Sequence, residues 1–211
     1  GLPNRVAALR NGTIGWTLEG LSLERGQHRQ FSNVSSEHVR PAALAACALA
    51  ARAGAARIDW RQLATWAEED ARTLYRFDVR TPEEFADGHL PGFRSAPGGQ
   101  LVQETDVFAP VRGARVVVSD DTGVRADMTA SWLAQMGWEV AVITLDSVDS
   151  VQLVVGAPEP PPTAPDRGRR YKRPYEGTDN PRVAMQAYLD WEYGLVAQLE
   201  RDGTHGFTVL S

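Results

Sequence analysis

Six residues, from Asp120 to Arg125, carry the chemistry that the sequence suggests most directly. They read Asp-Asp-Thr-Gly-Val-Arg and follow the apolar run Val116–Val118, which is typical of a buried parallel strand. A helix is expected from Ala126 to Met136, so the six residues join a strand to a helix. In such a loop, successive backbone N–H groups point at one spot and the helix dipole adds positive potential. The chemistry expected here is therefore the stabilisation of negative charge.

Two further motifs precede this loop. Residues 77–80 (Phe-Asp-Val-Arg) end an alternating run that predicts a strand over 74–80, and residues 81–85 (Thr-Pro-Glu-Glu-Phe) open a helix. Thr81 is expected to be the N-cap of this helix and Glu84 to complete a capping box. Residues 88–92 (Gly-His-Leu-Pro-Gly) have the composition of a turn.

Taken in order, these three motifs resemble the rhodanese superfamily, from about Ile58 to Ile143. Its domains carry an Asp-Val-Arg strand end, a Pro-Glu-Glu-Phe helix and a Gly-His-Ile/Leu-Pro-Gly turn. A catalytic cysteine then heads a six-residue loop that ends in arginine. The resemblance implies an α/β fold, a parallel sheet with helices on both faces, and sulfur transfer through a cysteine persulfide.

At the head of the loop, this sequence has Asp120 in place of the cysteine. A carboxylate cannot carry sulfur as a persulfide. We predict that Asp120 satisfies the N–H groups at the helix start with its own charge, which leaves the domain intact but catalytically silent. A rival hypothesis makes Asp120 the nucleophile or base of a hydrolase, a role that usually needs a metal and a second carboxylate.

The resemblance also assigns roles to the residues around Asp120. The predicted anion-binding loop comprises Asp120, Asp121, Thr122, Gly123, Val124 and Arg125, and the predicted supporting residues are Asp78, Arg80, Glu84 and His89. Asp78 and Arg80 are expected to form a structural network beneath the loop, and His89 to fix the turn. No catalytic residue, metal ion or cofactor is expected.

Two other features have simpler interpretations. Asp-Thr-Gly at 121–123 matches the aspartic-protease signature, but that chemistry needs two such aspartates, and no second copy exists in the sequence. Cys47 lies in an alanine-rich helix predicted over Val39–Ala53, where a buried structural cysteine is favoured over a reactive one.

The remaining pattern predicts the elements that position the loop. A helix is expected over Trp60–Thr73, and a strand over Trp138–Ile143 follows the loop helix. The inner side of the loop helix is predicted to carry Met128, Trp132, Leu133 and Met136. Strands alternating with helices predict a parallel α/β sheet, with extra helical segments at both ends of the chain.

The chain ends suggest a modular organisation. Residues 1–30, with a buried strand over Arg5–Leu9 and a short helix over Thr13–Gly20, resemble the tail of a preceding rhodanese domain; alternatively, they dock onto the central domain. The other predicted segments are a connecting helix (37–55), the rhodanese-like domain (56–155), a proline-rich basic linker (156–174) and a C-terminal helical extension (175–211). One apolar stripe on a helix over Pro181–Arg201 is expected to pack against the chain's own domain: Val183, Ala187, Tyr188, Trp191, Leu195 and Leu199.

Composition narrows the classes of function. A net charge of −5 gives no global basic field for nucleic acid, and no apolar run is long enough for a membrane span. A single cysteine fits a reducing compartment, so a cytoplasmic location is expected. The sequence thus predicts that this chain is a catalytically silent rhodanese-like domain, and that it is a C-terminal piece of a multi-domain sulfurtransferase. Its expected partners are the protein's other rhodanese domains and a small anion in the loop. The alternative is a regulatory, scaffolding or anion-binding module that supports a catalytic rhodanese domain elsewhere in the full-length protein.

Overall fold

The computed structural model describes residues 5–26, 34–144, 153–157 and 173–210. The chain forms two compact units, which we describe separately. The helical unit comprises Gly1–Ser32 and Arg169–His205, and the sheet unit comprises Asn33–Gly168 and Gly206–Ser211. Apart from residues 156–157 and 173–174, the predicted basic linker lies outside the described residues.

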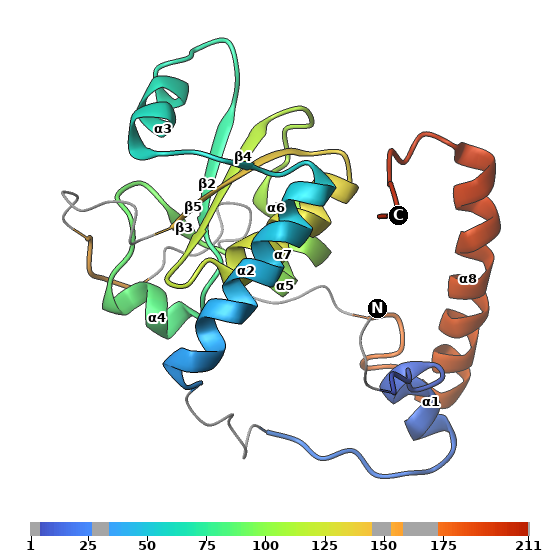
Figure 1. Ribbon diagram of the computed structural model, residues 1–211. Helices are drawn as coiled ribbons and strands as arrows, with labels where there is room; N and C mark the ends of the chain where they lie inside the picture. Colours follow the sequence, from blue (N-terminus) through green and yellow to red (C-terminus); the bar gives the residue numbers. More distant parts are fainter. Residues whose placement is uncertain (1–4, 27–33, 145–152, 158–172, 211) are drawn as a thin grey trace. The chain divides into compact units, whose positions relative to one another are not determined.

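A parallel sheet forms the centre of the sheet unit, as predicted. Its described strands number five and lie in the order β1-β5-β4-β2-β3 (Figure 1). Their bounds are β1 Ala56–Arg57, β2 Leu74–Asp78, β3 Arg94–Ser95, β4 Arg115–Asp120 and β5 Glu139–Thr144. Asp78 in β2 pairs in register with Ser119 in β4. The register therefore brings the ends of β2 and β4, with the motifs that follow them, to the same edge of the sheet.

Helices cover both faces of this sheet (Figure 1). The described helices of the unit are α2 Ser36–Ala53, α3 Trp60–Ala67, α4 Pro82–Asp87, α5 Gly98–Gln103, α6 Thr105–Phe108 and α7 Val124–Gln135. Alternation along β4 sends Val116 and Val118 to the core under α7, and Val117 to a second core against Leu63 of α3. The predicted two-sided α/β architecture is confirmed.

The inner face of α7 differs from the prediction. Met128 and Trp132 are 38% and 55% exposed, whereas Ala126, Ala130 and Leu133 are fully buried against the sheet. Small side chains at this i, i+4, i+7 spacing let the helix lie close to the strands, so the larger side chains point outward. The predicted inward positions of Leu133 and Met136 are confirmed.

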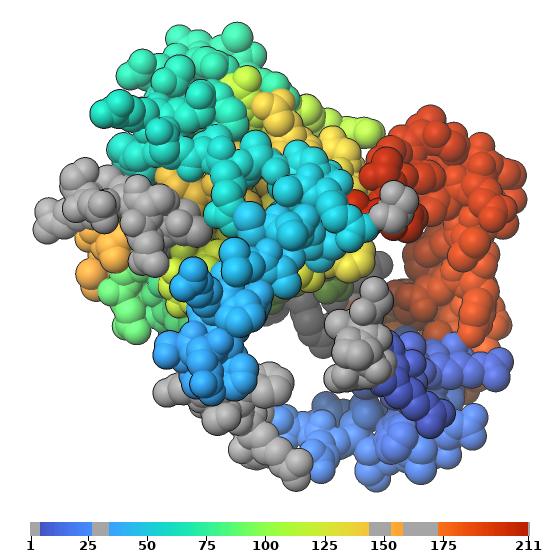
Figure 2. All heavy atoms as spheres, in the orientation of Figure 1, coloured from blue at the N-terminus to red at the C-terminus, as the bar shows by residue number. Residues whose placement is uncertain are grey.

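A second helix, α2, packs against α7. Its buried residues are the alanines Ala46 and Ala50, whose small side chains permit a close approach of the two helices. Figure 2 shows α2 at the surface of the sheet unit, where Leu44 is exposed. Gly54 ends α2 in the left-handed conformation (φ 93°), as expected of a helix C-cap.

Helix α3 is shorter than predicted. It ends at Ala67 rather than Thr73, because the residues after it are mostly polar and offer no apolar face to bury. Arg72 in this segment instead donates hydrogen bonds to the carbonyl oxygen of Gly113.

The helical unit is built from α1 Gly12–Leu18 and α8 Pro181–Asp202, which contact each other. Both helices were predicted, over Thr13–Gly20 and Pro181–Arg201. The predicted buried strand over Arg5–Leu9 is wrong: these residues form no strand, and the side chains of Val6 and Leu9 are 73% and 56% exposed. A strand needs a neighbour for its backbone groups, and the described part of this unit contains no sheet.

The termini of α8 follow the sequence, but its packing does not. Asn180 accepts a hydrogen bond from the N–H of Val183, and Gly203 ends the helix in the left-handed conformation. Leu189, outside the predicted stripe, is the buried side chain of the described helix, whereas Val183 and Trp191 are exposed. Helix α1 has 7 residues and covers little of the 22-residue α8. In the described part of the chain, no helix combines the length and apolar character that a membrane span requires.

Candidate functional site

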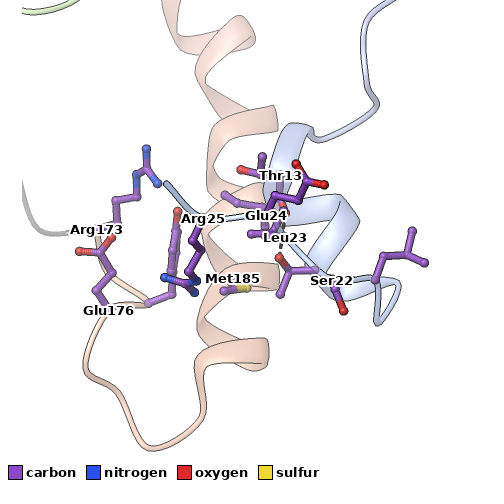
Figure 3. A pocket seen from close by; sticks show the side chains of 12 residues that line it. Thr13, Ser22, Leu23, Glu24, Arg25, Arg173, Glu176 and Met185 are labelled. Carbon is purple, nitrogen blue, oxygen red and sulfur yellow. Dashed lines mark hydrogen bonds between the residues drawn. The ribbon is translucent and has the colours of Figure 1, made fainter. Parts of the chain in front are cut away.

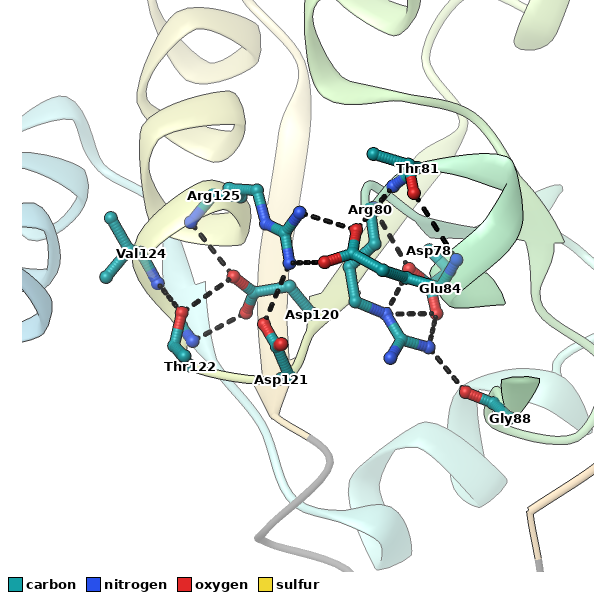
Figure 4. A network of polar contacts seen from close by, with 11 residues as sticks. Asp78, Arg80, Thr81, Glu84, Gly88, Asp120, Asp121, Thr122, Val124 and Arg125 are labelled. Atoms are coloured by element: carbon teal, nitrogen blue, oxygen red, sulfur yellow. Dashed lines mark hydrogen bonds and ion pairs between the residues drawn. The ribbon is translucent and has the colours of Figure 1, made fainter. Parts of the chain in front are cut away.

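The loop after β4 is centred on the carboxylate of Asp120, the last residue of that strand (Figure 4). This carboxylate is fully buried, and it accepts the backbone N–H of Gly123 at 2.6 Å and that of Arg125 at 2.9 Å. Gly123 adopts φ 81°, a left-handed conformation that turns the chain into α7. The side chain of Asp120 therefore occupies the spot at which the loop directs its N–H groups.

Burial has the largest effect on the protonation of Asp120. It raises the pKa of this carboxyl above the usual value, and the nearby charge of Asp121 acts in the same direction. The N–H groups of Gly123 and Arg125 lower the pKa and offset only part of this rise. Because both carboxylate oxygens already accept backbone N–H groups of the chain, the geometry opposes the hydrolase hypothesis, in which Asp120 must contact a substrate.

The rim of the loop is an ion network around Arg125 (Figure 4). Its guanidinium donates to both carboxylate oxygens of Glu84, at 2.7 and 3.0 Å, and to Asp121 at 3.0 Å. Burial opposes the charge of Arg125, but its bonds with Glu84 and Asp121 hold its pKa above the usual value. The network links α4 to the start of α7. Its ion pairs occupy the Arg125 guanidinium, which could otherwise bind an anion.

Glu84 also forms the predicted capping box of α4. Its carboxylate accepts the N–H of Thr81, and the hydroxyl of Thr81 accepts the N–H of Glu84. The hydrogen bond from Arg125 is the main reason why the pKa of Glu84 falls to about 2.

We expect Glu84→Gln to lower the free energy of unfolding at pH 7 by about 1 kcal/mol, a value reduced for the partial solvent exposure of this pair. Glutamine keeps the capping-box geometry but loses the charge. The folded pKa lies below the usual 4.5, so the stabilisation by Glu84 is present above pH 4.5 and is lost as the pH falls towards 2. Urea unfolding at pH 7 and near pH 2 should show the difference between variant and parent vanish in acid. Glu83→Gln, an exposed neighbour, is the control; an equal effect there would contradict the assignment.

Beside the loop, Asp78 and Arg80 form a buried ion pair (Figure 4). The Arg80 guanidinium donates to Asp78 through Nη2 at 2.6 Å and through Nε at 3.0 Å, and it also donates to the carbonyl oxygen of Gly88. Asp78 accepts the backbone N–H of Arg80 as well. The pair thus links the end of β2 to the turn that contains His89.

His89 lies within this turn and faces α4. Its ring stacks on Phe85 with a centroid separation of 3.6 Å, and Nδ1 is 2.9 Å from the Phe85 carbonyl oxygen. The backbone of His89 pairs with Val154 in an isolated bridge. These contacts place the ring against α4 and away from the Asp120 carboxylate, to which it makes no hydrogen bond in the described structure.

A second buried carboxylate, Asp127, was missed by the sequence interpretation. It lies in the first turn of α7 and forms an ion pair with Arg57 of β1. Burial raises its pKa, while the charge of Arg57 lowers it. The only local signal was an acidic residue one turn after the loop, because its partner is 70 residues away.

Arg57 also donates through Nε to the sulfur of Cys47, at 3.3 Å. Cys47 is half-buried, which corrects the prediction of a buried cysteine. Cys47 lies at the side of the α2 face that packs against α7, because Ala46 and Ala50 are the residues buried on that face. Its side chain therefore stays partly exposed to solvent.

Ser119 is buried, and its hydroxyl has no hydrogen-bond partner among the described residues. Within the same residues, no group of three or more His, Cys, Asp or Glu side chains is arranged to hold a metal ion.

Comparison with known proteins finds similarity to a protein family and to solved structures. A family described as rhodanese-like domain matches residues 60–147. A crystal structure of thiosulfate sulfurtransferase from Pseudomonas aeruginosa is similar at 41% identity and a TM-score of 0.86, over 100% of this chain and 61% of that one. The present chain therefore spans less than two thirds of that relative.

Two further solved structures are less similar to this chain. A rhodanese with anions from E. coli has 22% identity and a TM-score of 0.37, over 40% of this chain and 100% of that one. The BH2092 protein from Bacillus halodurans has 21% identity and a TM-score of 0.36, over 42% of this chain and 66% of that one. TM-scores this low support no structural inference. No curated protein sequence matches the chain.

Proposed function

This chain belongs to the rhodanese superfamily through its rhodanese-like domain, and we propose that this domain is a catalytically silent part of a sulfurtransferase-related protein. Asp120 replaces the cysteine that the family's chemistry requires. The observation that carries the proposal is the buried carboxylate of Asp120, which accepts the N–H groups of Gly123 and Arg125. The site that would stabilise a thiolate or persulfide is filled by a residue of the chain itself.

The same contacts argue against a small anion as the loop's ligand. Two of the N–H donors that would hold such an anion are engaged by Asp120, and the Arg125 guanidinium is engaged by Glu84 and Asp121. An incoming anion would also meet the negative charge of Asp121, which is partly exposed. The regulatory or scaffolding alternative needs no ligand in the loop and is favoured over the anion-binding one.

In the whole protein, sulfur transfer would take place on a cysteine outside this chain, in another rhodanese domain. The likeness to thiosulfate sulfurtransferase from Pseudomonas aeruginosa supports this proposal, since that chain is longer than the part matched here. The silent domain would then contribute structure or partner contacts to its catalytic neighbour.

We expect the chain alone to produce thiocyanate from thiosulfate and cyanide at the background rate. The cyanolysis assay should be run on the parent and on Cys47→Ala, because Cys47 is the single cysteine in the sequence. An active rhodanese in the same buffer serves as the positive control. Robust thiocyanate formation by the parent would overturn the proposal, whether or not Cys47→Ala abolishes it.

A further inference from the structure

The helical unit contains a cavity of about 730 Å³ that is separate in sequence from the loop at Asp120 (Figure 3). It is lined by α1, by residues 21–25, by residues 173–176 and by Met185 of α8. Small-molecule sites in proteins occupy about 300–1,000 Å³, so the cavity has the size of a binding site.

Hydrogen bonds fix the walls of this cavity. The indole N–H of Trp16 donates to the carbonyl oxygen of Ser22 at 2.9 Å, which folds residues 21–25 back onto α1. Arg182 of α8 donates to the carbonyl oxygens of Thr17 and Leu18 and so satisfies the C-terminus of α1. Tyr175, a buried wall residue, packs edge-on against Tyr188 of α8 with a centroid separation of 5.8 Å. These hydrogen bonds and this ring contact join the lining segments, so the cavity is preformed.

The lining combines an apolar surface with two guanidinium groups. Ile14, Leu23 and Met185 supply apolar surface. Arg25 and Arg173 come from opposite ends of the chain, yet both line the cavity, and Figure 3 shows them on the side away from Glu24. Glu176 lies near the two arginines and reduces the local positive charge. Within the described part of the chain, the Arg173 guanidinium forms no hydrogen bond or ion pair.

We propose that this cavity binds a small organic anion, whose carboxylate or sulfonate group meets Arg173 and whose apolar body contacts Ile14, Leu23 and Met185. The Arg173 guanidinium has no hydrogen-bond or ion-pair partner among the described residues, and it is suited to bidentate hydrogen bonding with such a group. The lining is about equally polar and apolar, so polar groups can hold the charged end of a ligand while its apolar body lies against the apolar side chains. The proposal assigns a role to Arg173, the described member of the basic run at 167–173.

The test is a fluorescence titration of the full chain with 1-anilinonaphthalene-8-sulfonate, an anionic aromatic probe. We expect one saturable site with a dissociation constant on the order of 10 µM, from typical ligand efficiency. Arg173→Glu should weaken binding at least about tenfold, because a charge-assisted hydrogen bond is lost and a repulsive charge is introduced. Arg10→Glu makes the same charge change at an exposed residue outside the cavity lining and should leave binding within about twofold.

Two further arms separate the cavity from general dye binding to exposed apolar surface. Octanoate should displace the probe, whereas octylamine, with the same chain length and opposite charge, should not. Met185→Trp, which narrows the cavity at its apolar wall and leaves Arg173 in place, should weaken binding at least about tenfold; circular dichroism checks that each variant is folded. Unsaturable binding, equal affinity in Arg173→Glu and Arg10→Glu, or equal displacement by octylamine would each overturn the proposal.

Discussion

The Asp120→Cys variant, made in a Cys47→Ala background, is expected to form thiocyanate from thiosulfate and cyanide at least roughly 10²-fold faster than its parent. Introducing a nucleophile can raise a rate by several orders of magnitude, since removing one costs up to about 10⁶ in a protease. In this variant the sulfur at position 120 takes the place of a carboxylate that accepts the N–H groups of Gly123 and Arg125. Those two donors and the start of α7 stabilise a thiolate in the same way.

The reaction expected of this variant has two steps. The thiolate attacks the sulfane sulfur of thiosulfate, the bond between the two sulfur atoms breaks, and sulfite leaves with the electron pair. Cyanide then attacks the outer sulfur of the persulfide, which releases thiocyanate and regenerates the thiolate. The acidic rim residues Glu84 and Asp121 oppose the approach of an anionic donor. The rate of the variant is therefore expected to stay far below that of an evolved rhodanese.

Asp120→Ser is the matched control for this gain. Its hydroxyl can accept an N–H bond in the loop but cannot hold a persulfide, so it should stay at the background rate. Mass spectrometry after incubation with thiosulfate should find one added sulfur atom on Asp120→Cys and none on Asp120→Ser. A folded Asp120→Cys protein that stays inert, with a thiol that reacts normally with an alkylating reagent, would show that the loop has departed from persulfide chemistry.

Features determined by neighbours in the sequence could be predicted from the sequence alone. The capping box of Thr81 and Glu84 follows from preferences at four adjacent positions, and the strand through Val116–Val118 follows from a continuous apolar run. The Asp120 loop was predictable for the same reason, because a strand-to-helix connection directs its N–H groups inward. The complete burial of the Asp120 carboxylate could be established only from the structure.

Features determined by distant residues could not be predicted. The ion pair of Asp127 with Arg57 depends on how β1 lies beside β5 and α7, which no local pattern encodes. The orientation of α7 was misjudged because Trp132 and Met128 are the larger apolar residues, whereas the close approach of sheet and helix selects alanines. The strand predicted over Arg5–Leu9 lacks a sheet neighbour in the described unit. In each case, tertiary packing overrides the local preference.

The Asp78→Ala variant is expected to lose about 3–5 kcal/mol of unfolding free energy, the typical cost of removing one partner from a buried ion pair. Arg80 is only 7% exposed, so its charge would remain buried with the Gly88 carbonyl oxygen as its remaining hydrogen-bond partner in the described structure. The backbone N–H of Arg80 would also lose its acceptor. Urea denaturation followed by circular dichroism measures the loss. The pair links β2 to the turn at His89, so the variant should also expose the amides of residues 88–92 to faster hydrogen exchange.

A double variant separates the charge from the shape of this pair. Asp78→Asn with Arg80→Met removes both charges, keeps an acceptor for the backbone N–H at residue 80, and fills the space of the arginine stem. Because replacing both members of a buried pair is often neutral, the double variant should recover most of the stability lost in Asp78→Ala. A loss below about 1 kcal/mol in Asp78→Ala would mean that water reaches Arg80 readily. A double variant as unstable as the single one would instead assign the role of the pair to its contact with Gly88, since Arg80→Met removes that contact too.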